Sequence, residues 1–174
     1  MLKLLFTVDY EIHGSGMGSP GELIVEPTNR MLAQLDRYGA RLTIMADVAE
    51  LLKFREWAEA HGEDRFHYEA IAQQLRRAVR TGHDVQLHVH SGYFNSQFVD
   101  GVWRQDYSEY DLARLGHERL LELITRGKAF LEQLLRPVKP DYRCFAFRAA
   151  NWSMHPTPDI ARALTDAGIT IDSS

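Results

Sequence analysis

Two histidines that stand two residues apart, His88 and His90, are the side chains of this sequence best suited to hold a metal ion. In the segment 85–90, apolar and polar residues alternate, which is the period of a β-strand. Both imidazoles therefore point to the same face of the strand and can converge on one divalent cation. The alternative is a pair of exposed polar side chains on that face. Flanking glycines and two acids near the N-terminus favour the metal site.

Asp9 and Glu11, at the end of the first apolar run, are the candidate partners of these histidines. One carboxylate and two imidazoles would leave positions on a cation open for water and substrate, as a catalytic site requires. The cation would polarise a carbonyl, and the second carboxylate would take a proton from the metal-bound water. Arg148, after another apolar run, could pair with and orient that base. The alternatives are a solvated acidic turn and a surface arginine.

These side chains need a scaffold, and the apolar patterns predict one of alternating strands and helices. Strands are expected at 2–8, 42–46, 85–90, 144–147 and 169–171, and helices at 27–38, 48–61, 68–80, 111–135 and 158–167. The first strand reads as buried on both faces. Asp47 is expected to cap the second helix, with Glu50 completing a capping box. This rhythm indicates βα units and a mainly parallel sheet, whose carboxyl edge gathers the polar candidates.

Five strands are fewer than a closed barrel needs, and the last one has no covering element after it. We therefore expect the natural protein to continue beyond Ser174. The segment 91–110 shows no clear periodicity and is rich in aromatic residues from Tyr93 onward. These rings could form a wall for a substrate or pack into a local cluster, and the sequence does not decide between the two.

Composition excludes several classes of protein. The 174 residues fit one domain, and 45% hydrophobic with 25% charged residues is typical of a globular protein. A net charge of −4 and the lack of a basic run argue against nucleic acid as a partner. The one cysteine, Cys144, lies in an apolar run and is expected to be a buried, inert thiol.

No stretch reaches membrane-spanning length, and the N-terminal apolar run is too short for a secretion signal. The sequence thus predicts no membrane segment and a cytoplasmic protein, unless the chain is cut from a longer one. The oligomeric state is left open.

Four segments in order resemble the motifs of the polysaccharide deacetylase family (carbohydrate esterase family 4, the NodB-type homology domain), over essentially the whole chain. Segment 7–11 (TVDYE) resembles TFDDG, segment 82–90 (GHDVQLHVH) resembles GHEIGSHTxxH, segment 147–152 (FRAANW) resembles FRxPxG, and Asp172 lies where the fourth motif begins. The resemblance implies a single domain, residues 1–174, with a distorted, incomplete (β/α) barrel. It also implies removal of an N-acetyl group from an amino sugar of a polysaccharide or its precursor.

The resemblance implies roles for individual residues. Asp9 would be the general base, His88 a metal ligand, and Arg148 the residue that tethers the base. We assign Glu11 and His90 as the other ligands of a divalent metal, with zinc as the first choice. The residues expected to bind the carbohydrate substrate are Tyr93, Asn151 and Trp152.

The chain departs from the family pattern at several points. Tyr10 separates the two acids, and the second family histidine, four residues after the first, falls on Gly92. His90 must take its place. The Pro and Gly of the third motif are absent, and so is the late LxH motif that carries the general acid. Two other functions therefore stand beside the deacetylase: a non-catalytic carbohydrate-binding relative, and a metal hydrolase of the amidohydrolase type. The latter carries its HxH on the first strand, whereas here it lies mid-chain.

Overall fold

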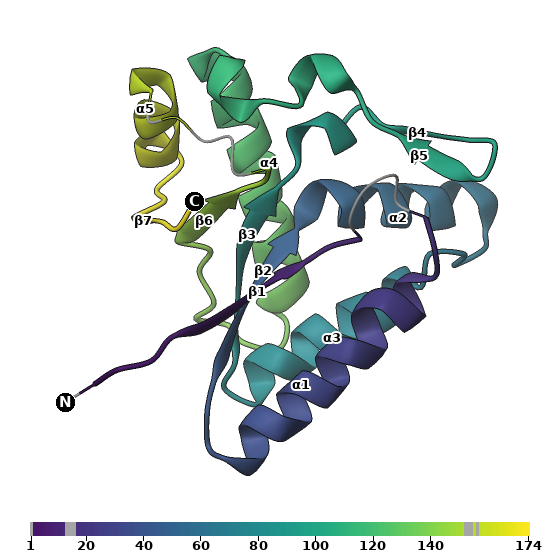
Figure 1. The fold of residues 1–174 in the computed structure, drawn as a ribbon, viewed down its shortest axis with the longest axis vertical. Helices are drawn as coiled ribbons and strands as arrows, with labels where there is room; N and C mark the ends of the chain where they lie inside the picture. The colour runs from purple at the N-terminus through teal and green to yellow at the C-terminus, as the bar shows by residue number, and fades with distance from the viewer. Residues whose placement is uncertain (1, 13–16, 152–154, 156) are drawn as a thin grey trace.

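A five-stranded parallel sheet lies at the centre of this computed structural model, which describes residues 2–12, 17–151, 155 and 157–174 (Figure 1). The strand order is β1-β2-β3-β6-β7, and every neighbouring pair is parallel. The strands are β1 (Phe6–Tyr10), β2 (Leu42–Asp47), β3 (Asp84–Val89), β6 (Ala146–Ala149) and β7 (Ile171–Asp172). The predicted alternation of strands and helices is confirmed. In the described part of the chain the sheet is open, so its closure into a barrel stays a prediction.

In the residues that the structure describes, five α-helices connect the strands. They are α1 (Glu26–Arg37), which continues the short π-helix η1 (Gly21–Val25), α2 (Val48–His61), α3 (Tyr68–Arg80), α4 (His117–Leu135) and α5 (Pro158–Asp166). Helices α2, α3 and α4 pack against β3, and α5 packs against α4. The core lies between them, with Val85, Leu87 and Val89 fully buried. A Cβ on Gly127 of α4 would lie 2.7 Å from Cδ1 of Leu87, so α4 approaches β3 closely at this glycine.

The prediction of a first strand buried on both faces is wrong. The paired register of β1 begins at Phe6, which lies opposite Leu42, the first residue of β2. Among the described residues, no strand pairs with 2–5, and Leu2, Leu4 and Leu5 are 83%, 69% and 92% exposed. Strand β1 is an edge of the sheet in the described residues, so it cannot be covered as a central strand is.

The segment after β3 holds structure that periodicity did not predict. A hairpin of β4 (Gln97–Val99) and β5 (Val102–Arg104) turns at Asp100 and Gly101, whose φ angles are 53° and 82°. Two positive φ values define the turn that Asp-Gly favours, and that dipeptide was the available signal. Phe98 and Trp103 join Phe66 in a local aromatic cluster with ring centroids 5.1–5.3 Å apart. For these rings the cluster alternative holds.

Three further boundaries differ from prediction. Helix α4 begins at His117 rather than 111, because the 3-10 helix η4 (Leu112–Arg114) and Gly116 precede it. Strands β6 and β7 begin two residues later than expected. Before β6, the side-chain oxygen of Gln86 accepts the backbone N–H groups of Phe145 and Ala146, both at 2.9 Å, so a side chain replaces the neighbouring strand there.

Cys144 is fully buried, and burial raises the pKa of its thiol to about 12, which agrees with an inert thiol. Among the helices of the described residues, none is both long and apolar enough to cross a bilayer.

Candidate metal site

Polar side chains line up across the carboxyl ends of the parallel strands. Asp47 of β2 lies opposite His88 of β3, which lies opposite Arg148 of β6. In a parallel sheet, residues in one such row point to the same face. Glu11 directly follows β1 and extends the row to the edge strand. Four segments distant in sequence thus bring their polar side chains to one edge of the sheet.

The structure brings Glu11, His88 and His90 together. Glu11 Oε2 lies 2.8 Å from His88 Nε2 and 2.6 Å from His90 Nε2. The ligand atoms of the three residues all lie within 4.8 Å of one another, the spacing at which one metal ion can be shared. The His88 side chain is 2% exposed, whereas His90 keeps 12% and Glu11 keeps 19%. The cluster is therefore enclosed on the sheet side and open to solvent on the other.

The hydrogen bond on the far side of His88 fixes which ring nitrogen can bind a metal. His88 Nδ1 lies 2.9 Å from the backbone carbonyl oxygen of Arg148. A carbonyl only accepts, so Nδ1 carries the proton and donates it. In the neutral ring, Nε2 then presents a lone pair to Glu11 Oε2, which is also an acceptor. Such a pair requires a proton or a cation between its members, and histidines that bind metals are commonly oriented by a carbonyl in this way.

Charge interactions within the cluster agree with this geometry. Burial by itself would raise the pKa of Glu11, but hydrogen bonds to His88 and His90 and their charges hold it far below its usual range. Burial lowers the pKa values of both histidines, but the hydrogen bond to Glu11 and the nearby charge of Asp47 outweigh it, and both end above 6.5. Without a metal, the cluster therefore holds protons where a cation could sit.

The Asp9 carboxylate lies beside this cluster and pairs with Arg148. The distance from Arg148 Nη1 to Asp9 Oδ1 is 2.5 Å, and Arg148 Nη2 donates to the Thr7 hydroxyl at 3.0 Å. Asp9 is 42% exposed and free to meet a ligand, and its charge contributes to raising the pKa of His90. The arginine thus reaches from β6 to the edge strand and fixes the orientation of the carboxylate.

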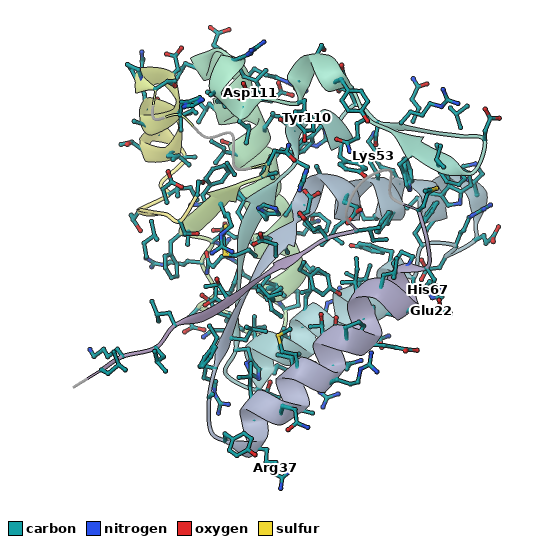
Figure 2. The ribbon with its side chains drawn as sticks, viewed as in Figure 1. Glu22, Arg37, Lys53, His67, Tyr110 and Asp111 are labelled. Carbon is teal, nitrogen blue, oxygen red and sulfur yellow. The ribbon has the colours of Figure 1, made fainter. Side chains whose placement is uncertain are left out.

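The predicted substrate residues lie at different depths. Tyr93 is 2% exposed, and its ring stands edge-on to that of His90 at 6.1 Å. Asn151 Nδ2 donates to the Tyr110 carbonyl at 3.4 Å. Trp152 lies outside the described residues. Figure 2 labels Tyr110, whose ring lies 5.9 Å from that of Tyr107, which is 73% exposed. The exposed rings that adjoin Asn151 in this way are thus Tyr110 and, beside it, Tyr107.

A close backbone contact explains one departure from the family motif. The second histidine of the motif falls on Gly92, which has no side chain to offer a metal. A Cβ at this position would lie 2.8 Å from the carbonyl oxygen of Asp106. Asp106 N–H in turn donates to the Gly92 carbonyl at 2.9 Å. A larger residue at 92 would displace this backbone, whereas His90 reaches Glu11 directly.

Two buried acids next to the cluster were predicted only as a capping box. Asp47 does cap α2, accepting from Ala49 N–H at 3.2 Å. Glu50 does not complete the box, because its Oε2 accepts from Ile12 N–H at 2.9 Å instead. Both acids are 1% exposed, and burial raises the pKa of each. The position of Asp47 at the end of a strand, in the row of Glu11 and His88, was the signal that could have placed it at the site.

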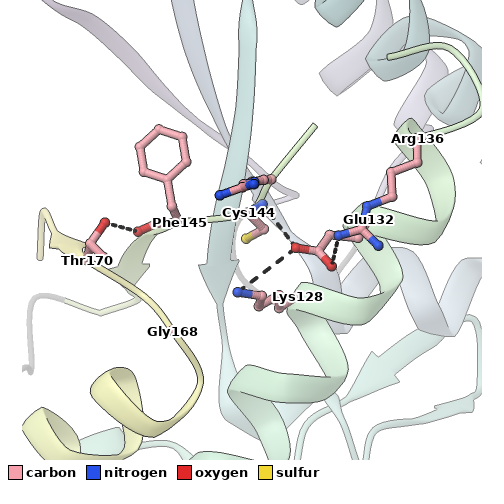
Figure 3. Close-up of a pocket in the computed structure, with 8 residues that line it drawn as sticks. Lys128, Glu132, Arg136, Cys144, Phe145, Gly168 and Thr170 are labelled. Atoms are coloured by element: carbon pink, nitrogen blue, oxygen red, sulfur yellow. Dashed lines mark hydrogen bonds and ion pairs between the residues drawn. The ribbon is translucent and has the colours of Figure 1, made fainter. Parts of the chain in front are cut away.

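A separate pocket lies at the opposite edge of the sheet (Figure 3). Cys144 and Phe145 in its wall precede β6, and Thr170 precedes β7. Glu132 of α4 lies at its centre, 2.7 Å from Arg136 Nη2 and 4.0 Å from Lys128 Nζ. This pocket contains none of the predicted site residues.

Comparison with solved structures shows which fold this is. Over 97% of the chain, the structure matches a family 4 carbohydrate esterase from Streptomyces lividans solved with acetate, at a TM-score of 0.56 and 15% identity. It matches a family 4 pseudoenzyme from Bacillus anthracis over 97% at 0.55 and 10% identity. A mutant of the peptidoglycan deacetylase of Bacillus subtilis matches over 96% at 0.50 and 16% identity.

The chain thus has the fold of the family 4 polysaccharide deacetylases, as the motif resemblance implied. It spans 60%, 41% and 55% of the lengths of these three proteins. No protein-family model and no curated protein sequence matches the chain.

Proposed function

We propose that this protein is a metal-dependent deacetylase that removes the N-acetyl group from an amino sugar of a polysaccharide or its precursor. The observation that carries the proposal is the convergence of Glu11, His88 and His90 within 4.8 Å beside the Asp9–Arg148 pair. Two imidazoles and a carboxylate are a donor set that suits zinc and other divalent metals of similar size. The deacetylase fold of the structural neighbours supports the same reaction class.

Each residue has a distinct task in this proposal. Glu11 and the Nε2 atoms of His88 and His90 hold the metal, which when bound acts as a Lewis acid toward a carbonyl and makes water more acidic. Asp9 accepts the proton of the attacking water as the general base. Arg148 orients Asp9 through its 2.5 Å contact, and its carbonyl orients His88. Asn151, Trp152 and Tyr93 are proposed to contact or line the sugar site.

The finer features of the proposal rest on sequence. Zinc is the first choice of metal because of the imidazole pair. A cytoplasmic location and the continuation of the sheet into a barrel are likewise proposed on the sequence patterns described above.

Acetate release tests the proposed reaction. We expect the zinc-loaded chain to release acetate from N-acetylglucosamine oligomers, and a chelator to stop it. Asp9→Asn should keep the metal and lower turnover by about 10²- to 10⁴-fold, as removal of a general base does. Asp100→Asn is the matched control, because Asp100 pairs with Arg104 at 3.3 Å on the surface hairpin. If Asp9→Asn loses the metal instead, the roles of Asp9 and Glu11 are exchanged.

A second candidate is binding of carbohydrate without hydrolysis. It is favoured by the closed position at Gly92, where the second histidine of the family motif falls. One structural neighbour is itself a pseudoenzyme. Binding of the same oligomers by the metal-loaded chain, with no acetate released at any pH, would favour this candidate over the deacetylase.

A further inference from the structure

The first turn of α2 lies against both segments that supply the proposed metal ligands. Asp47 ends β2 and caps α2, and Glu50 lies three residues further on. Both side chains belong to one rigid turn and are 1% exposed. We propose that Asp47 and Glu50 are positioning residues that hold His90 and Glu11 in place relative to each other, so that both can reach one cation. This inference rests on the proposed metal site.

Asp47 connects α2 to the strand end that carries the histidines. Its Oδ1 accepts from Ala49 N–H, inside α2, and from His90 N–H, both at 3.2 Å. The first contact is an ordinary N-cap. The second joins residues 43 positions apart and lies on the backbone of a proposed ligand. One carboxylate oxygen thus fixes the backbone of His90 to the start of a helix.

Glu50 makes the corresponding contact to the other ligand segment. Its Oε2 accepts from the N–H of Ile12 at 2.9 Å, across 38 positions of sequence. Ile12 directly follows Glu11, and its own side chain is buried at 5% exposure. Glu11 comes after the last residue of β1, so the β1–β2 ladder does not hold it. The Glu50 contact therefore supplies the backbone constraint that the sheet does not.

The cost of burying these acids argues against a purely structural cap. Asp47 Oδ2 and Glu50 Oε1 are buried with no hydrogen-bond partner among the described residues. Neither carboxylate pairs with a lysine or arginine in that part of the chain. Burying a carboxylate costs stability even where, as for Asp47, the charges of His88 and His90 act on it, and an uncharged Ser or Asn caps a helix as well. Acids kept at such a cost point to a task beyond capping.

Asp64, three residues before the N-cap His67 of α3, is an acid whose side chain serves only the start of a helix. Its carboxylate accepts from Tyr68 N–H at 2.6 Å and from Glu69 N–H at 3.0 Å, at the start of α3. It is exposed, and both of these contacts stay within five positions of sequence. Asp64 and Asp47 each accept two backbone N–H groups, but only Asp47 reaches a proposed ligand. Asp64→Ala is therefore the matched control.

The test compares zinc affinity in variants that remove or keep the acceptor. Glu50→Ala and Asp47→Ala should weaken zinc binding by about 10- to 100-fold, as loss of groups that orient metal ligands does. Glu50→Gln and Asp47→Asn keep an acceptor oxygen and should restore most of the affinity. Asp64→Ala should bind zinc as the wild type does. Affinity is measured by competition with a chelating dye.

A second variant covers the case in which alanine prevents folding. Glu50→Met fills the space without a buried charge, so the protein should unfold at a temperature equal to or above that of the wild type. Zinc affinity should nevertheless fall as in Glu50→Ala. A structural role alone would change stability and leave affinity as it was. The inference is overturned if Glu50→Met and Asp47→Ala fold and bind zinc with wild-type affinity. It is also overturned if Glu50→Gln and Asp47→Asn lose as much zinc affinity as the alanine variants.

Amide hydrogen exchange of the metal-free protein separates this inference from the proposed function. Ile12 N–H and His90 N–H should be protected in the wild type and should lose protection in Glu50→Ala and Asp47→Ala respectively. Should the wild type bind no zinc, the proposed function fails. The exchange data then still decide whether these acids hold the two segments, and unchanged protection in the variants overturns the inference.

Discussion

Charged clusters lie at both ends of the parallel strands, at the carboxyl edge and the amino edge of the central sheet, and their carboxylates are neutralised in different ways. At the carboxyl edge, Glu11 faces two histidines from the end of another strand, with the buried acids Asp47 and Glu50 beside them. At the amino edge, Glu132 is balanced by Lys128 on its own helix and by Arg136 at the C-cap of that helix, each four positions away (Figure 3).

The difference lies in how each cluster is compensated. Glu132 also accepts from Cys144 N–H at 3.4 Å, so its charge is answered by permanent cations and a backbone donor. The carboxyl-edge cluster depends on protons held by His88 and His90, whose pKa values are raised, or on a cation in their place. A carboxylate neutralised by lysine and arginine side chains stabilises the fold without a ligand. A carboxylate that has only titratable imidazoles beside it, in a cluster assembled from distant segments, indicates a site for a ligand.

Removing either histidine should have the largest effect on zinc binding. A small effect would contradict the contrast between the two clusters. We expect His88→Ala and His90→Ala each to abolish zinc retention through dialysis, because each removes one of three protein ligands. Metal content of the purified protein is the measurement. His117→Ala is the control, since His117 pairs with Asp166 at 2.9 Å between α4 and α5. A His90→Ala protein that retains its zinc would show that His90 is not a ligand.

The pH dependence of stability sharpens the same contrast. The raised pKa values of His88 and His90 stabilise the metal-free fold most below 6.5, and this contribution is lost as the pH rises through those values. The lowered pKa of Glu11 gives a contribution that is complete above 4.5 and is lost only in strong acid.

The melting temperature of the metal-free protein should therefore fall as the pH is raised from 6.5 to 8. Zinc should reverse this fall, because it binds the deprotonated imidazoles. Thermal unfolding with and without zinc across this range is the measurement. A metal-free melting temperature that rises with pH would contradict the protonated cluster.

The smallest effect is expected at the amino edge. Glu132→Ala leaves Lys128 and Arg136 without their shared partner and should destabilise the fold by about 1 kcal/mol, since Arg136 is half exposed and screened by water. Zinc affinity should not change. Denaturant unfolding and zinc titration of the same variant check both statements. A loss of zinc affinity here would mean that the two edges are coupled.

Sequence patterns predicted the scaffold well where they reflect local chemistry. The strand expected from period two in 85–90 and the Asp47 cap of the second helix both hold in the structure. The same patterns gave wrong burial or wrong strand bounds where residues distant in sequence determine the structure. The exposure of Leu2 depends on where β2 begins, and the start of β6 depends on the Gln86 side chain.

The candidate site could be predicted in part for the same reason. Equal spacing along a strand was enough to expect His88 and His90 on one face, and strand ends were enough to expect Glu11 nearby. The use of Glu50 could not be predicted, because a capping box and a contact with Ile12 look alike in sequence. Likewise, the contact that closes the space at Gly92 comes from Asp106, at the start of a 3-10 helix that the periodicity of the sequence did not predict.

The central claim is that one cation binds between Glu11, His88 and His90, and anomalous diffraction from crystals soaked in zinc tests it most directly. We predict a single strong peak about 2.0–2.2 Å from the Nε2 atoms of both histidines and from a Glu11 carboxylate oxygen. A peak only at other residues, or none at this edge of the sheet, would contradict it.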